Sequence, residues 1–155
     1  KLEGSCHCGA VRFSVDSSAP YPYMRCYCSV CRKTAGGGGY AINLGADSGS
    51  LRIEGEENLS VYRVASETNE DGMRQARGIL QGLRPALWVY DPRWPELVHP
   101  FASAIDSELP APPETVHIML ASKAGWVAAE AGPDHEQFDE YPEESLSDWH
   151  RRHRV

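Results

Sequence analysis

Short apolar segments follow one another along the chain and are separated by Gly, Pro, Asp and Ser. The clearest is 10–15, in which Val11, Phe13 and Val15 alternate with polar residues as they do in a half-buried strand. Many short strands with turn residues between them indicate a mainly β fold. Further strands are predicted at 21–27, 39–44, 50–54, 59–64, 86–90, 101–105, 116–120 and 125–129.

Helical signals are few. Ser29–Thr34 can form one turn directly after a Cys-x-Cys pair. Near the end of the chain, Ser145 can cap a short helix that reaches His153, with Asp148 three residues later as a weak capping-box partner. The segment Asp106–Pro113 is rich in proline and acidic residues and predicts an ordered surface loop, because proline cannot donate to a strand ladder.

Length and charge narrow the class of protein. The 155 residues fit a single domain with one core, spanning 1–155. The net charge of −7 argues against a nucleic-acid partner, whose phosphates attract clustered Lys and Arg. No apolar run approaches the roughly 20 residues that span a bilayer, so no membrane partner is expected. Residues 1–10 lack the apolar core of a signal peptide, which favours a cytoplasmic location.

All five cysteines lie between Cys6 and Cys31. A disulfide scaffold would spread its cysteines so that they join distant loops. Close Cys-x-Cys and Cys-x-x-Cys pairs, in a chain expected to be cytosolic, are instead typical of metal ligands.

Cys26 and Cys28 are separated by one residue, so their side chains lie on the same face of an extended strand. Cys31 follows in a tight turn and can point back at the same ion. Three thiolates then converge at Zn–S distances of roughly 2.3 Å, and zinc is the natural choice because it is borderline-soft and redox-inert. Arg32 and Lys33 follow at once, and their charge favours the thiolate forms.

Three protein ligands leave the fourth zinc position open, which is typical of catalytic sites, whereas structural sites are closed by four ligands. In the alternative interpretation a distant histidine, His99 or His117, closes the site and the zinc is only structural. Cys6 and Cys8 form a second Cys-x-Cys pair. Two ligands are too few for zinc, and the later Cys-x-x-Cys that would complete such a site does not occur in the sequence.

At these motifs the chain resembles the glutathione-dependent formaldehyde-activating enzymes, which share a domain with centromere protein V. The likeness covers nearly the whole chain, and the two cysteine motifs at this spacing are specific to that family. The matching residues are 4–13 (Gly-Ser-Cys-His-Cys-Gly-Ala-Val-Arg-Phe), 26–33 (Cys-Tyr-Cys-Ser-Val-Cys-Arg-Lys), 86–88 (Ala-Leu-Trp), His117, 121–127 (Ala-Ser-Lys-Ala-Gly-Trp-Val), Phe138, 141–142 (Tyr-Pro) and 145–150 (Ser to Trp-His).

The resemblance implies coiled antiparallel β-sheets, as in B-type methionine sulfoxide reductases (a β-tent fold), with a short C-terminal helix. It implies a catalytic zinc on Cys26, Cys28 and Cys31, and a structural zinc on Cys6, Cys8 and a later Cys-x-x-Cys. The implied reaction condenses glutathione with formaldehyde to S-hydroxymethylglutathione, a carbon–sulfur lyase run in the condensing direction. A non-catalytic zinc-stabilised binding module and a zinc Lewis-acid enzyme acting on another small carbonyl compound stay open as alternatives.

The chain departs from the family pattern just before the Ala-Leu-Trp segment, where Leu80 and Leu83 stand in place of the two later cysteines. Reading possible codons for Ile79–Arg84 one nucleotide later restores a Phe-Cys-x-x-Cys-Gly motif. In one interpretation this segment is a local frameshift, in the gene or in the reading of its sequence; an erroneous reading predicts two zinc ions. In the other, the leucines are real and packed, and the chain binds one zinc.

The substrate is expected to be a small thiol with an aldehyde, and the oligomeric state is left open. Glutathione carries two carboxylates, and Arg32 and Lys33 are the nearest candidate partners in the sequence. His7 lies between two ligands and, if on a strand, points to the opposite face, which favours packing or hydrogen bonding.

Two further groups of side chains are candidates for a binding cleft. Trp88, Trp94 and Trp126 are interpreted as core residues rather than as stackers on a ligand, because tryptophan buries so much area. Asp91, Arg93 and Asp106 lie near the ends of β segments and could line a cleft, although surface-loop roles are favoured.

Overall fold

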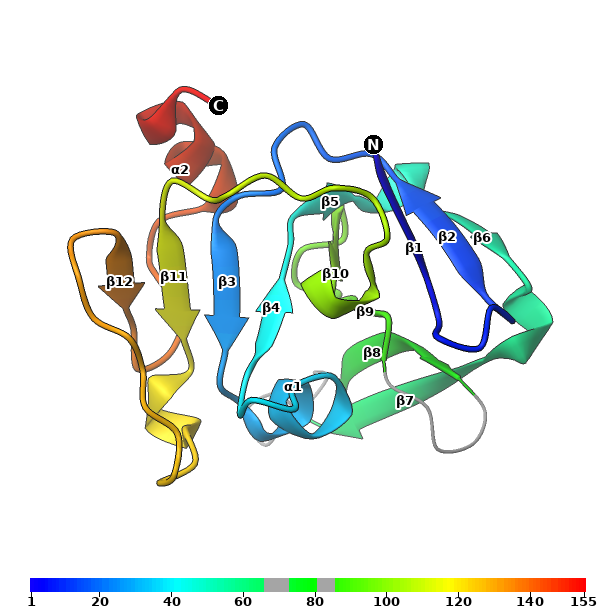
Figure 1. Cartoon of the computed structure of the whole chain (residues 1–155), viewed down its shortest axis with the longest axis horizontal. Coiled ribbons are helices and arrows are strands. Elements are labelled where there is room, and N and C mark those ends of the chain that lie inside the picture. The colour runs from blue at the N-terminus through cyan, green and yellow to red at the C-terminus, as the bar shows by residue number, and fades with distance from the viewer. Residues whose placement is uncertain (66–72, 81–85) are drawn as a thin grey trace.

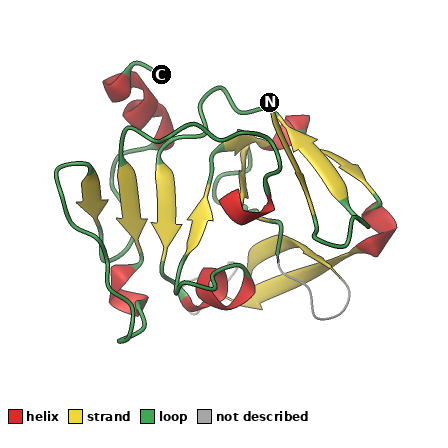
Figure 2. Cartoon of the chain, in the orientation of Figure 1, coloured by secondary structure: helices red, strands yellow, loops and turns green. Residues whose placement is uncertain are grey.

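The computed structural model describes the backbone of residues 1–65, 73–80 and 86–155, and the side chains of 1–62 and 86–155. The described chain is mainly β, with two α-helices and four 3-10 turns (Figures 1 and 2). The helices are α1 (Ser29–Thr34) and α2 (Leu146–His153), and the 3-10 turns are η1 (Ser48–Ser50), η2 (Glu56–Asn58), η3 (Ala102–Ala104) and η4 (Leu120–Ser122). The strands are β1 (Leu2–Ser5), β2 (Arg12–Val15), β3 (Tyr23–Cys26), β4 (Ala41–Asn43), β5 (Ala46–Asp47), β6 (Arg52–Glu54), β7 (Leu59–Ala65), β8 (Met73–Leu80), β9 (Trp88–Val89), β10 (Leu97–Pro100), β11 (Thr115–Ile118) and β12 (His135–Gln137).

The described strands form two three-stranded sheets, β1-β2-β6 and β5-β10-β9, a four-stranded sheet β12-β11-β3-β4, and the hairpin β7-β8. Both three-stranded sheets and the hairpin are antiparallel. Several antiparallel sheets and a short C-terminal helix confirm the predicted fold class. The four-stranded sheet adds a feature that the pattern does not reveal, because β11 pairs in parallel with both β3 and β12.

The four-stranded sheet fixes the end of β3, where the cysteine chemistry begins. All four residues of β11 are buried, as expected for a parallel strand covered on both faces. Cys26, the last residue of β3, pairs with Ile118 on one side and Ala41 on the other. The chain therefore enters the cysteine segment from the middle of a sheet, not from a mobile edge.

Two apolar clusters form the core. One is centred on Phe13 and Trp88, whose rings meet edge to face with centroids 5.1 Å apart. The other holds Cys26, Cys28 and Cys31 together with aliphatic and aromatic side chains, among them Phe101. The cysteines that were predicted to bind metal are thus part of the packed interior.

Both predicted helices are present. α1 coincides with Ser29–Thr34, and α2 ends at His153 as expected. Ser145 caps α2, because its Oγ accepts a hydrogen bond of 3.1 Å from the backbone N–H of Asp148. Segment 106–113 contains no helix or strand, in agreement with the predicted loop. None of the described helices is long and apolar enough to cross a membrane.

Two predicted strands are wrong. Segment 101–105 forms the 3-10 turn η3, and only its flanking residues Phe101 and Ile105 make isolated bridges. Segment 125–129 forms a turn in which the N–H of Val127 donates to the carbonyl of Ala124. In both places small residues allow the chain to turn. The apolar residues that predict a strand there follow one another in the sequence, but the turn prevents them from forming one.

Candidate metal centre and cleft

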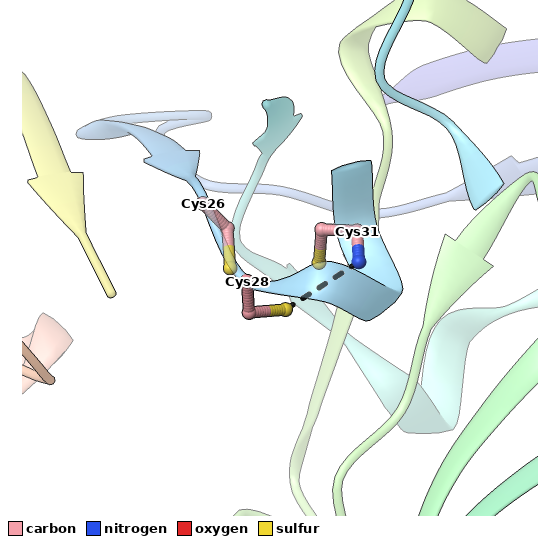
Figure 3. A group of neighbouring side chains, drawn as sticks. All are labelled: Cys26, Cys28 and Cys31. Carbon is pink, nitrogen blue, oxygen red and sulfur yellow. Dashed lines mark hydrogen bonds between the residues drawn. The ribbon is translucent and has the colours of Figure 1, made fainter. Parts of the chain in front are cut away.

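Cys26, Cys28 and Cys31, the cysteine trio, lie at the junction of β3 and α1 (Figure 3). Cys28 keeps an extended backbone (φ −62°, ψ 157°), so its side chain stays on the same face as that of Cys26, as strand alternation predicts. The first turn of α1 then brings Cys31 back toward the other two. The three sulfur atoms all lie within 4.8 Å of one another. Tetrahedral zinc with 2.3 Å bonds holds its sulfur atoms about 3.8 Å apart, so the trio fits such an ion.

The three thiols of the trio shift one another's pKa values. Hydrogen bonds from the Cys26 and Cys31 thiols, together with the backbone N–H of Cys31, lower the pKa of Cys28 to about 2. The bond to Cys28 in turn raises the pKa of Cys26 to about 12, and contacts with both neighbours raise the pKa of Cys31 well above its ordinary value. The three thiols therefore share protons through their mutual hydrogen bonds, and a bound cation favours all three residues as thiolates.

The residue between the first two cysteines points to the opposite face and is held there. Tyr27 is fully buried, and its hydroxyl lies 2.7 Å from Nδ1 of His117. Nε2 of His117 lies 2.8 Å from Nδ1 of His135. Both ring nitrogens of His117 are thus occupied on the side of the sheet away from the sulfur atoms. His117 anchors the strand that carries the trio and does not close the metal site.

The buried His117 predicts a dependence of stability on pH. Burial lowers its pKa from 6.5 to about 4, and the charges of Arg25 and His135 act in the same direction. Between these values the unfolded chain binds more protons than the folded chain, so stability is full above about pH 6.5 and falls as the pH drops toward 4. We expect urea unfolding between pH 4 and 7 to show this slope, and His117→Gln to reduce it. The exposed His7→Gln should keep the wild-type slope; equal slopes in all three proteins would refute the assignment.

No fourth His, Cys, Asp or Glu joins the cysteine trio within the part of the chain that the structure describes. His99, the other histidine considered as a fourth ligand, lines the same cleft but stands outside the set of mutually close donor atoms. Among the described residues the arrangement is therefore that of a three-ligand site, which leaves a position for water or substrate.

A cleft of about 990 Å³ opens at the trio, at the upper end of the range for small-molecule sites. It lies between the ends of β3 and β4, the strands β5 and β10, and the segment before α2. Its lining includes, beside the three cysteines, the polar and aromatic side chains of Asn43, Asp91, Trp94, His99 and Tyr141.

Asp91 lines this cleft and is 8% exposed, so the favoured surface-loop role is wrong for this residue. Arg93 donates two hydrogen bonds to the Asp91 carboxylate, with Nη2 2.7 Å and Nε 3.1 Å from Oδ2. The guanidinium also lies 4.5 Å from the ring centroid of Trp94. Asp106 lies elsewhere, in a separate depression beside β1 and β2. Asp91 is thus part of the cleft wall, and Arg93 holds its carboxylate in place from outside the lining.

The tryptophans divide into three environments. Trp88 is buried in the core, which confirms its prediction. Trp94 is half-buried, lines the cleft and packs edge-on against Tyr141 with centroids 5.4 Å apart. Trp126 is 71% exposed, so its assignment to the core is wrong. It lies on the 124–127 turn beside Gly39, where a side chain in place of the glycine hydrogen would collide with Val127.

Cys6 and Cys8 converge in a turn and not on a strand. The N–H of Gly9 donates to the carbonyl of Cys6 at 2.8 Å, and Gly9 takes a φ of +75° that favours glycine. The two sulfur atoms lie 3.0 Å apart. His7 is exposed at the tip of this turn, so the packing role based on a strand is wrong.

The residues that stand in place of the family's later cysteines lie at the edge of the described part of the chain or outside it. β8 ends at Leu80, whose backbone pairs with Leu59, but the side chain of Leu80 and the whole of Leu83 lie outside the described residues. Whether Cys6 and Cys8 hold a second ion stays a prediction. Arg32 and Lys33 follow Cys31 on α1 but are not among the residues that line the cleft, so their contact with substrate carboxylates also stays a prediction.

Comparison with known proteins decides the family. The sequence model described as glutathione-dependent formaldehyde-activating enzyme matches residues 1–76. A Halomonas elongata protein, which carries the provisional name glutathione-dependent formaldehyde-activating enzyme, is 57% identical over 153 residues, or 97% of this chain and 95% of the relative. The chain belongs to this family. The expected resemblance is confirmed, and membership of the formaldehyde-activating family agrees with a cysteine cluster that could hold a metal ion.

Proposed function

We propose that this protein uses zinc bound by the cysteine trio to condense the thiol of glutathione with formaldehyde, giving S-hydroxymethylglutathione. The observation that carries the proposal is the trio itself: three converging sulfur atoms that line a cleft and that no fourth donor joins among the described residues. Family membership supplies the substrate class. A zinc ion in such a site acts as a Lewis acid, which stabilises thiolate and polarises a carbonyl oxygen.

The chain's own residues support this chemistry in separate ways. The trio supplies soft thiolate ligands, which favour zinc over hard cations. Burial of all three cysteines keeps the site within the packed interior. The cleft is large enough for a tripeptide thiol, and the aromatic wall of Trp94 and Tyr141 provides apolar contact surface.

The proposal is tested by the rate of thiol–formaldehyde exchange, because the uncatalysed addition already proceeds. Exchange NMR with ¹³C-formaldehyde and glutathione gives the rate of formation and breakdown of the product at equilibrium. We expect zinc-loaded protein to accelerate this exchange, and metal-free protein or S-methylglutathione to give only the background rate. An unaccelerated exchange with zinc bound would contradict the proposal and favour a binding module. Acceleration only with another small aldehyde would favour a different carbonyl substrate.

A further inference from the structure

His99, on β10, presents one defined edge to the cleft. Its Nδ1 lies 3.1 Å from the carbonyl oxygen of Leu44. A carbonyl can only accept, so Nδ1 carries the hydrogen and Nε2 keeps its lone pair. Since the Nδ1 edge is held against the main chain, the Nε2 edge is the one available to a molecule in the cleft that His99 lines. Burial lowers the pKa of His99, which keeps the imidazole neutral near pH 7.

Asn43, on β4, lines the same cleft beside Cys31 and has an oxygen that needs a donor. Its Nδ2 lies 4.0 Å from Sγ of Cys31. A thiolate can only accept a hydrogen bond, so this orientation of the amide suits an ionised Cys31. The side chain is 7% exposed, and Oδ1 is buried with no hydrogen-bond partner among the described residues. Buried polar atoms are almost always paired, so this atom points to a donor that arrives with a ligand.

The backbone brings the segments that carry these two residues together. The N–H of Leu44 donates to the carbonyl of Pro100 at 2.9 Å, and Asn43 forms an antiparallel bridge with Phe101. The segments that carry Asn43 and His99 therefore run side by side along the cleft. His99 offers a nitrogen lone pair and Asn43 offers an oxygen acceptor, in the same cleft as the three sulfur atoms. These two groups match a substrate that enters with an S–H donor and leaves with an O–H donor.

We propose that His99 is the proton carrier of the condensation and that Asn43 receives the hydroxyl group that forms, an inference that rests on the proposed function. Nε2 of His99 takes the proton of the substrate S–H bond. The sulfur electron pair forms the C–S bond to the aldehyde carbon, and the carbonyl π pair moves to oxygen. That oxygen then takes the proton back from Nε2, so that thiol and aldehyde give the hydroxymethyl thioether with nothing left over. The new hydroxyl donates to Oδ1 of Asn43.

The surroundings of His99 suit this role. Asp91 is the charged group whose field reaches the imidazole and acts against the effect of burial. Arg93 binds Asp91 through two nitrogen atoms and balances its charge, so Asp91 does not fix His99 as an imidazolium. A neutral imidazole with a free lone pair is the form that a proton acceptor needs.

The test compares zinc-loaded wild type with His99→Gln in the exchange assay. General acid–base groups contribute 10²- to 10⁴-fold, so we expect the accelerated rate to fall by about 100-fold or more. Zinc stoichiometry should not change, and the limb of the pH–rate profile that follows His99 should disappear. His7→Gln, at an exposed histidine, is the matched control and should behave as wild type. An unchanged rate in His99→Gln, or loss of zinc together with the rate, would overturn the proposal.

A second measurement does not depend on turnover. Long-range ¹H–¹⁵N NMR of zinc-loaded protein should show His99 with hydrogen on Nδ1, and titration with glutathione alone should shift its Nε2 resonance to saturation. Asn43→Leu should leave the tautomer unchanged. If wild type fails to accelerate exchange but Nε2 still responds to thiol, the proposed function fails and the contact with His99 stands. If the hydrogen is on Nε2, or if the Nε2 resonance does not shift with glutathione, the inference fails regardless of the exchange rate.

Discussion

Replacing Cys28 with serine is expected to remove zinc from the cysteine trio and to abolish accelerated exchange between glutathione and formaldehyde. Cys28 supplies one of the three converging sulfur atoms of the trio, and it also caps α1 through the N–H of Cys31. Serine can keep the cap, but it does not supply a soft thiolate. Even the loss of an outer-shell partner costs metal sites 10- to 100-fold in affinity, so loss of a ligand should cost more than about 100-fold.

Cys8→Ser is the matched control, because it removes a thiol from the other Cys-x-Cys pair and leaves the trio intact. Zinc affinity and stoichiometry, measured by competition with a chromophoric chelator, should show that Cys8→Ser keeps the zinc that supports exchange. The count in wild type also separates one bound ion from two. The prediction would be contradicted if Cys28→Ser kept the zinc that supports exchange and Cys8→Ser lost it. That result would assign the functional zinc to Cys6 and Cys8.

The cysteine trio, the candidate metal centre, could be predicted from the sequence because all its residues lie within a segment of six. Strand alternation places Cys26 and Cys28 on one face, and a single helical turn returns Cys31, so local backbone geometry alone assembles the trio. The same reasoning failed at Cys6–Gly9, where the segment is a turn and the alternation rule does not apply. The alternation rule for side chains therefore applies only where the segment is known to be a strand.

The arrangement of the cleft wall could not be predicted, because it depends on pairings between distant segments. Asn43 and His99 are separated by more than fifty residues, and their segments are joined through the contacts of Leu44 with Pro100 and His99. Neither residue carries a motif in the sequence. An unpartnered buried amide oxygen is visible only once the surrounding hydrogen bonds are known.

The fold class followed from alternation, but the sheet order did not. Segment 10–15 alternates and contains β2, whereas β12 (His-Glu-Gln) has no apolar residue and could not be found by hydrophobic period. The parallel register of β11 with β3 is equally hidden, because it joins segments about ninety residues apart. Apolar residues at 125–129 suggested a strand, but Gly125 lies in a turn and leaves Trp126 in solvent.

Trp88→Ala is expected to cost about 3–5 kcal/mol of unfolding free energy, the range for removing a large buried aromatic side chain. Trp88 is 2% exposed and meets Phe13 edge to face, so its loss leaves a cavity in the cluster between β2 and β9. Domains of this kind are stable by only about 5–15 kcal/mol, so the variant should lose a large share of its stability and melt on the order of 10 °C lower.

Trp126→Ala provides the comparison, since it removes the same atoms from a site that is 71% exposed. We expect a change within about 0.5 kcal/mol, as for other surface substitutions. Both variants should be unfolded with denaturant in zinc-saturated buffer, because a metal that binds only the folded chain adds to its apparent stability. Comparable losses in the two proteins would mean that Trp88 does not carry the core cluster. A large loss in Trp88→Ala with one zinc still bound at the trio would show that the metal centre and the Phe13–Trp88 cluster are separate sources of stability.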